Sequence, residues 1–224
     1  MMEQNTIAPI LVTAGPTYEA IDSVRFIGNR SSGRMGVAIA EASCDRGYET
    51  ILLLGPNCVE PPDHELLTVA RFRSTTDLEG LLNDYWPGKA NTLIMAAAVS
   101  DFRPKRNGGE NPANAATIKL RRQEAGLTLE LESTPDLVAM CCVRKRAGQR
   151  VIGFALESTD ELVLRAEEKL RRKGLDAIVA NPLDTMDSDE VRATLVCAHD
   201  KKFEPGPMSK TNFAKWMLRE LNRI

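Results

Sequence analysis

Short apolar runs and amphipathic stretches alternate along almost the whole chain. Runs typical of strands lie at Ile10–Thr13, Thr50–Leu54, Leu67–Ala70, Thr92–Ala97, Val151–Ala155 and Ala177–Ala180. Stretches with helical periodicity separate them, at Arg34–Arg46, Thr76–Tyr85, Pro135–Arg146 and Asp160–Lys173. This alternation predicts an α/β fold with a Rossmann-like, doubly wound and mostly parallel sheet.

Two regions depart from this alternation. Near the C-terminus, Ala193–Ala198 and Lys202–Phe203 predict a hairpin around His199, and Ser209–Asn222 predicts a closing helix. The segment 101–132 begins rich in Arg, Asn, Gly and Pro, and then alternates over Thr117–Arg121 and Leu127–Glu132. Such an insertion is either a flap or dimerisation excursion or a plain surface hairpin. A chain of 224 residues, 43% hydrophobic, predicts a single domain over 1–224.

Charge and composition narrow the classes of function. The formal net charge is −2, so no overall field favours nucleic acid or an anionic membrane. No apolar stretch approaches the roughly 18 residues of a membrane helix, and the first nine residues are too polar for a signal peptide. Five cysteines without C-x-x-C spacing and two histidines predict reduced thiols and no structural zinc. We expect a cytoplasmic protein, with metal ligands still open.

Residues 12–36 carry the strongest local signal. The apolar strand ends at Gly15-Pro16, and Ser31-Ser32-Gly33 precede the next helix, where hydroxyls and unpaired amides attract anions. An N-cap and a tight turn are enough to explain Ser31-Ser32-Gly33 taken by itself. Helix capping does not, however, require Arg25 and Asn29 in the same loop. The pattern matches neither the dinucleotide-binding fingerprint nor the Walker loop.

Other candidates follow later strands. Asp101 comes after the small residues that end a buried strand, where α/β sheets bind ligands, so it suits a ribose, a base or a metal. Phe154 also ends a strand, and Lys169 and Lys173 share one helix face. The alternatives are a turn cap for Asp101, core packing for Phe154 and a solvated face for the lysines.

The order of these motifs resembles one enzyme family. TAGPT, VRFIGNRSSGRMG, AAAVSDFRP, STPDLV, GFALES and GLDAIVAN, with the Lys169/Lys173 spacing, resemble the phosphopantothenoylcysteine synthetases, or phosphopantothenate–cysteine ligases. The resemblance extends from Pro9 to Phe213, and without a decarboxylase half we expect the stand-alone bacterial form. It implies a homodimer that uses CTP with Mg²⁺ to convert 4′-phosphopantothenate to an acyl cytidylate and pyrophosphate. The amine of L-cysteine then attacks, releasing CMP in coenzyme A biosynthesis.

The resemblance also implies roles for individual residues. Asn29 and Arg25 would act on the acyl cytidylate, and Asn29, Ala97 and Ala98 would contact the substrate. The first lysine of the family's flap falls on Thr117, so Lys119 becomes the catalytic candidate, with Arg121 or Lys105 as substitutes. The nucleotide would be held by Gly15, Ser31, Ser32, Gly33, Met95, Asp101, Pro135, Asp136, Leu137, Val138, Phe154, Lys169 and Lys173.

Two other functions stay open at this point. The uncharged Thr117 favours a non-catalytic or altered-specificity nucleotide-binding paralogue. The fold alone suggests an NAD(P)-dependent oxidoreductase, although the glycine fingerprint is missing. The choice between CTP and ATP rests on base-edge hydrogen bonds that no side-chain pattern reveals.

Overall fold

A central eight-stranded sheet organises the chain. The computed structural model describes residues 9–105, 119, 121, 126–158, 161–186, 188–198 and 201–223. The strand order is β13-β12-β10-β9-β6-β1-β4-β5; β12 pairs antiparallel with both of its neighbours, β10 and β13, and the other neighbouring strands pair in parallel. The strands are β1 (Ile10–Ala14), β4 (Thr50–Leu54), β5 (Leu67–Arg71), β6 (Thr92–Met95), β9 (Arg150–Glu157), β10 (Ala177–Pro182), β12 (Thr194–Cys197) and β13 (Lys202–Phe203). The predicted Rossmann-like sheet is confirmed.

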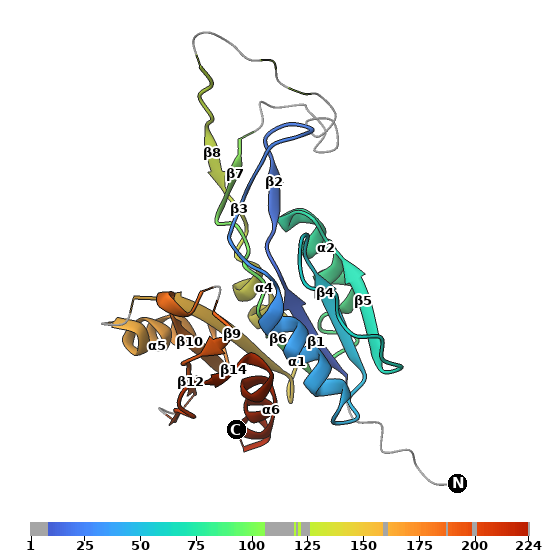
Figure 1. Cartoon of the computed structure of the whole chain (residues 1–224), viewed down its shortest axis with the longest axis vertical. Helices are drawn as coiled ribbons and strands as arrows, with labels where there is room; N and C mark the ends of the chain where they lie inside the picture. The colour runs from blue at the N-terminus through green and yellow to red at the C-terminus, as the bar shows by residue number, and fades with distance from the viewer. Residues whose placement is uncertain are drawn as a thin grey trace.

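Helices cover both faces of the sheet (Figure 1). Helices α1 (Arg34–Cys44) and α6 (Lys210–Glu220) share one core with Val12 and Val179. Helices α2 (Thr75–Tyr85), α4 (Leu137–Arg144) and α5 (Leu162–Lys173) share the other core with Leu11 and Ile178. Because both faces are buried, central strands such as β1 are almost continuous apolar runs instead of alternating ones, whereas the edge strand β5 is partly exposed.

Two antiparallel ribbons form an arm that projects from the carboxyl end of the sheet (Figure 1). Strand β2 (Tyr18–Ala20) pairs with β3 (Phe26–Gly28), where we expected only a polar loop, and the rings of Tyr18 and Phe26 stack at 3.7 Å. The second ribbon pairs β7 (Phe102–Pro104) with β8 (Leu131–Ser133).

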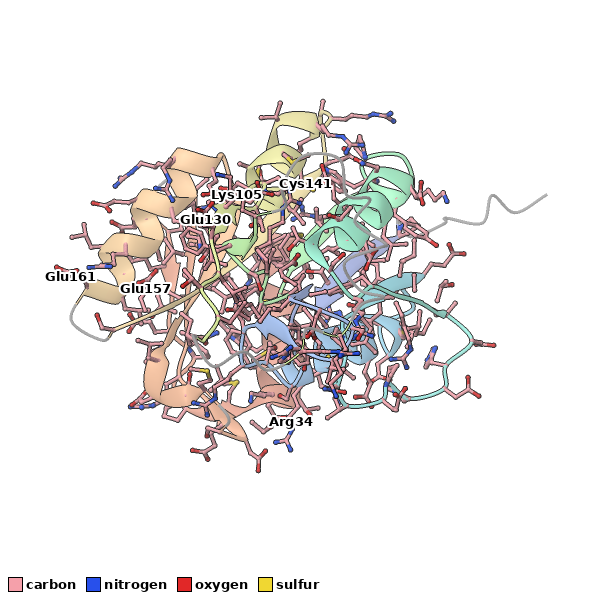
Figure 2. The ribbon with its side chains drawn as sticks, turned by 90° about the horizontal axis from the view of Figure 1, so that it is seen from above. Arg34, Lys105, Glu130, Cys141, Glu157 and Glu161 are labelled. Carbon is pink, nitrogen blue, oxygen red and sulfur yellow. The ribbon has the colours of Figure 1, made fainter. Side chains whose placement is uncertain are left out.

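The second ribbon corrects the prediction for 101–132. Leu127–Glu132 was expected to be strand-like, but the observed strand is Leu131–Ser133, which pairs with Phe102–Pro104, and 127–130 lie in no strand. Ion pairs join Arg103 to Glu132 at 2.7 Å and Lys105 to Glu130 at 3.4 Å (Figure 2 labels Lys105 and Glu130). Because β7 and β8 are far apart in the sequence, no local periodicity of apolar residues indicates that they pair. Thr117 lies outside the described residues.

The remaining boundaries differ from the predicted ones by a few residues. The helix expected from Pro135 begins at Leu137, because the Asp136 carboxylate accepts a hydrogen bond from the Ala139 N–H at 3.0 Å and caps it. The chain also forms β11 (Glu190–Val191), β14 (Met208–Ser209) and the short helices η2 (Leu183–Thr185) and η3 (Leu221–Arg223). In the described part of the chain, no helix combines the length and apolarity that a membrane crossing requires.

The five cysteines are free thiols. Burial raises the pKa of Cys141 to about 12 and the pKa values of Cys142 and Cys197 to about 11. Burial also raises the pKa of Cys44 and of Cys58. Protonated thiols are poor nucleophiles, so the structure agrees with the expected reduced, structural cysteines.

Candidate functional site

A cavity of about 680 Å³ opens beyond the carboxyl ends of β6, β9 and β10 and the N-terminus of α1. Strand order changes direction between β1 and β6, the position at which doubly wound sheets bind ligands. The cavity is lined by residues 28–36, 96–99 and 154–157 and by Asp101, Lys169, Asn181, Thr185, Met186, Val191 and Lys210.

The N-terminus of α1 forms one wall. Gly33 precedes the helix with φ of 70°, and no side chain caps the first turn. The Ser31 hydroxyl accepts a hydrogen bond from the Gly33 N–H at 3.4 Å, and the Ser32 carbonyl accepts one from the Val59 N–H at 3.2 Å. Because the first amides of a helix have no intrahelical partner, this wall suits an anion.

Asn29 joins two segments of the cavity wall. Its Nδ2 donates to the Val99 carbonyl at 2.9 Å and to the Ala98 carbonyl at 3.5 Å. The Ala97 N–H donates to Thr13 Oγ1 at 3.1 Å, and the Ala98 N–H to the Gly15 carbonyl at 2.8 Å. The Asn29 amide therefore holds the Ala97–Val99 backbone against the α1 side of the cavity.

Lys169 supplies a half-buried cation to the opposite wall. Its Nζ donates to the Phe154 carbonyl at 3.4 Å. Burial lowers the pKa of Lys169, and repulsion from Lys173 lowers it further, while Glu157, Asp136 and Asp101 oppose the shift. Phe154, Asp101 and Lys169 were predicted as site residues, and all three line the same cavity.

Lys173 and the start of α4 lie beside the cavity and do not line it. Lys173 Nζ lies 2.8 Å from an Asp136 carboxylate oxygen. Burial raises the pKa of Asp136, but the hydrogen bonds from Lys173 and the Ala139 N–H outweigh it, so the pKa is lowered. The predicted roles of Lys173 and of Pro135, Asp136, Leu137 and Val138 in nucleotide binding stay predictions.

Four other predicted residues are not part of the cavity lining. Met95 is buried in the core, and its Sδ accepts from Thr13 Oγ1 at 3.8 Å. Gly15 forms the turn behind the Ser31–Gly33 wall. Arg25 lies in the β2–β3 turn, where its Nε donates to Asp22 at 2.9 Å, and Lys119 is exposed. None of the four lines the cavity.

Sequence reasoning missed several lining residues. Arg30, Arg34 and Lys210 add positive charge, Glu157 adds a carboxylate, and Asn181 adds an amide at the end of β10 (Figure 2 labels Arg34 and Glu157). The polar Asn181 after the apolar run Ala177–Ala180 was a usable signal. In the sequence, Arg30, Arg34, Lys210 and Glu157 cannot be told from ordinary surface charges. Only the fold places them at one cavity.

The oxygen donors of the cavity suit a magnesium ion that arrives with a phosphate group. Among the described residues no three His, Cys, Asp or Glu side chains form a metal cluster. The cavity instead offers the carboxylate of Asp101 and the buried Asn181 Oδ1, which has no hydrogen-bond partner in the described part of the chain. Magnesium commonly binds through one or two protein oxygens, substrate phosphates and water.

Lys169 makes anion binding sensitive to pH. Its lowered pKa means that it loses its charge below the alkaline pH of an ordinary lysine, and a bound triphosphate will raise that pKa again. Binding of inorganic triphosphate should take up a proton at alkaline pH, and Lys169→Met should weaken that binding roughly ten- to hundredfold. Calorimetry in buffers of different ionisation heat measures both effects.

Arg172→Met provides the control for this prediction, because Arg172 is exposed on the same helix and does not line the cavity. It should leave affinity and proton uptake unchanged. Unaltered proton uptake in Lys169→Met would contradict the role of Lys169.

The chain is similar to one protein family along nearly its whole length. Residues 6–224 match the family model described as the DNA/pantothenate metabolism flavoprotein C-terminal domain. The coenzyme A biosynthesis bifunctional protein CoaBC of Bacillus subtilis (strain 168) is 35% identical over 217 residues, 95% of this chain and 50% of that protein. A cysteine/cysteine sulfinic acid decarboxylase from an unknown prokaryotic organism is 37% identical over 174 residues, 78% of this chain and 45% of the relative.

A solved structure is similar along nearly its whole length. The crystal structure of the C-terminal domain of a CoaBC protein has a TM-score of 0.77 and 33% identity, and the match covers 96% of this chain and 93% of that chain. The chain spans about half the length of the curated relatives it matches.

Proposed function

Because the chain belongs to the DNA/pantothenate metabolism flavoprotein C-terminal domain family, we propose that it is a phosphopantothenate–cysteine ligase of coenzyme A biosynthesis. It uses CTP and Mg²⁺ to activate 4′-phosphopantothenate and then transfers the acyl group to L-cysteine. Such an enzyme works in the cytoplasm, and the chain acts as one domain over 1–224. Family membership leaves the nicotinamide-dependent alternative without support.

The observation that carries the proposal is the composition of one cavity. An uncapped helix start, Lys169 and Asn29 with the Ala97–Val99 backbone all line it. A carboxylate becomes a good electrophile only when its oxygen joins a good leaving group, so the reaction needs a phosphate-binding wall next to an acyl-binding wall. The cavity supplies both.

Each wall has a part in the proposed reaction. The first-turn amides of α1 and the hydroxyls of Ser31 and Ser32 bind phosphate oxygens, and Lys169 offsets their charge. Asn29 fixes the Ala97–Val99 backbone around the acyl group, so that the cysteine amine meets a carbonyl of fixed orientation. Magnesium, when bound, neutralises charge on the departing pyrophosphate.

We also propose that two copies of the chain associate through the arm. Six large apolar side chains on or beside the arm ribbons are at least 38% exposed: Val24, Phe26, Phe102, Leu127, Leu129 and Leu131. A set of exposed apolar side chains on one projecting element is typical of a protein–protein contact. Arg25 lies on this arm, away from the cavity of its own chain, so a role for Arg25 in catalysis requires such an association.

Leu131→Asp tests the association. A carboxylate in an apolar contact is desolvated without a partner, so the dimer dissociation constant should rise at least about tenfold. Sedimentation velocity over a range of concentrations measures it. Val143→Asp makes the same change at an apolar residue that is 87% exposed on α4, away from the arm, and should have no effect. A monomeric parent protein would rule the association out.

A pyrophosphate-release assay tests the function directly. Phosphopantothenate with CTP should release pyrophosphate, and adding L-cysteine should yield CMP and the amide. Replacing CTP with ATP then measures the nucleotide preference. If CTP binds but no pyrophosphate forms, the chain is the non-catalytic nucleotide-binding paralogue that Thr117 suggested.

A further inference from the structure

Asn181, the second-to-last residue of strand β10, ends the apolar run of that strand with a polar side chain. Strand β10 runs through the fully buried Ala177, Ile178, Val179 and Ala180 before it reaches Asn181. Asparagine is depleted in strands, because its amide competes for backbone hydrogen bonds and packs poorly. Its position at the carboxyl end of β10 is where an α/β sheet presents side chains to a ligand.

The Asn181 side chain has an unmet hydrogen-bonding requirement. Its Oδ1 is buried and accepts no hydrogen bond from the described residues. Nearly all buried polar atoms in folded proteins have a partner, so an orphaned acceptor that lines a cavity points to a group that occupies the cavity. That group must present a donor or a cation to an oxygen.

The register of the sheet places Asn181 on the phosphate-binding side. Side chains alternate along a strand, so Asn181 shares a face with Val179, which packs in the core of α1 and α6. Phe154 is in register with Val179 and packs against the same core. Asn181 therefore faces the cavity from the side on which α1 begins.

Phosphate alone cannot satisfy this oxygen. The uncapped first turn of α1 and the side chain of Arg34 make this side of the cavity suitable for phosphate. Phosphate oxygens accept hydrogen bonds, as Asn181 Oδ1 does, and two acceptors repel each other unless a cation or a shared donor lies between them. Carboxamide oxygens are established ligands for hard divalent cations.

We propose that Asn181 Oδ1 binds the divalent cation that accompanies the nucleotide phosphates, directly or through a water molecule on that cation. The inference rests on the proposed function, because it assumes a nucleotide triphosphate in the cavity. It assigns a cation contact to a residue outside the predicted nucleotide-binding set. It also explains why a polar residue ends the apolar run of β10.

Calorimetric titration with CTP, in excess Mg²⁺ and in EDTA, tests the assignment. In the parent protein Mg²⁺ should strengthen CTP binding. Asn181→Ala should reduce that strengthening roughly tenfold, as loss of a cation-supporting group does, while metal-free affinity stays unchanged. Asn181→Asp keeps an oxygen and should retain the Mg²⁺ effect. Asn212→Ala, at an exposed asparagine outside the cavity, is the matched control and should resemble the parent.

The possible failures are distinguishable. A parent protein that does not bind CTP overturns the proposed function and the inference together. If Mg²⁺ does not change the CTP affinity of the parent protein, the inference alone is overturned. The same holds if the Asn181→Ala variant keeps the full Mg²⁺ effect. Equal weakening with and without Mg²⁺, with altered preference for CTP over UTP, assigns Asn181 to the base and also overturns it. Thermal unfolding verifies that each variant is folded.

Discussion

Asn29→Asp should slow transfer of the acyl group to cysteine by about 100-fold or more, the scale of losing an oriented amide donor in an active site. The Asn29 amide now donates to the carbonyls of Val99 and Ala98. A carboxylate cannot donate, and its charge repels both carbonyl oxygens, so the Ala97–Val99 wall moves. Single-turnover measurement with cysteine reports this step.

Pyrophosphate release should fall less, within about tenfold, because the proposed phosphate-binding wall at α1 does not depend on Asn29. The matched control is Asn83→Asp, since Asn83 uses its side-chain oxygen to accept from Arg144 and an aspartate still accepts. It should leave both steps unchanged. Equal losses in the two half-reactions of Asn29→Asp would contradict the assigned role.

Gly36→Ala should destabilise the protein by roughly 1–3 kcal/mol, the usual cost of overpacking a core. A Cβ at Gly36 would lie 2.4 Å from the Ala14 Cβ and 3.0 Å from the Thr13 carbonyl oxygen, so α1 has to move away from β1. The Ser31–Gly33 wall would move with α1, and CTP affinity should fall as well. Urea unfolding and calorimetry measure the two effects.

Gly80→Ala makes the same substitution in α2, where a Cβ would meet nothing within 4 Å. It should stabilise the protein by about 1 kcal/mol, because alanine favours a helix over glycine. If Gly36→Ala were as stable as Gly80→Ala, close packing between α1 and β1 would not be what excludes a side chain at residue 36.

Local patterns predicted much of this architecture, because apolar periodicity reports burial directly. The central parallel strands were readable as apolar runs, since a strand covered on both faces needs apolar side chains throughout, whereas the edge strand β5 is partly exposed. The Ser31–Gly33 wall and Lys169 were readable because a helix start and a helix face are short-range features. Ser31, Ser32, Gly33 and Lys169 line one cavity in the structure.

Pairing between segments that are distant in the sequence could not be predicted from such local patterns. The ribbon of β7 and β8 joins Arg103 to Glu132, and nothing in either segment specifies the other. The same limitation applies to Arg25, which is close to Ser31 in the sequence but lies on the arm with Asp22, outside the cavity lining, so its catalytic role stays a prediction. Closeness in the sequence does not determine where a hairpin places a side chain in space.

The sequence by itself determined the elements, their alternation and the residues suited to bind phosphate, since each depends on neighbours within one or two helical turns. Only the tertiary structure decided that Asn29 holds the backbone of Val99, and that Asn181 faces the cavity with an unpartnered oxygen. Both facts depend on strand order and register. These are set by burial summed over the whole sheet, which no single segment encodes.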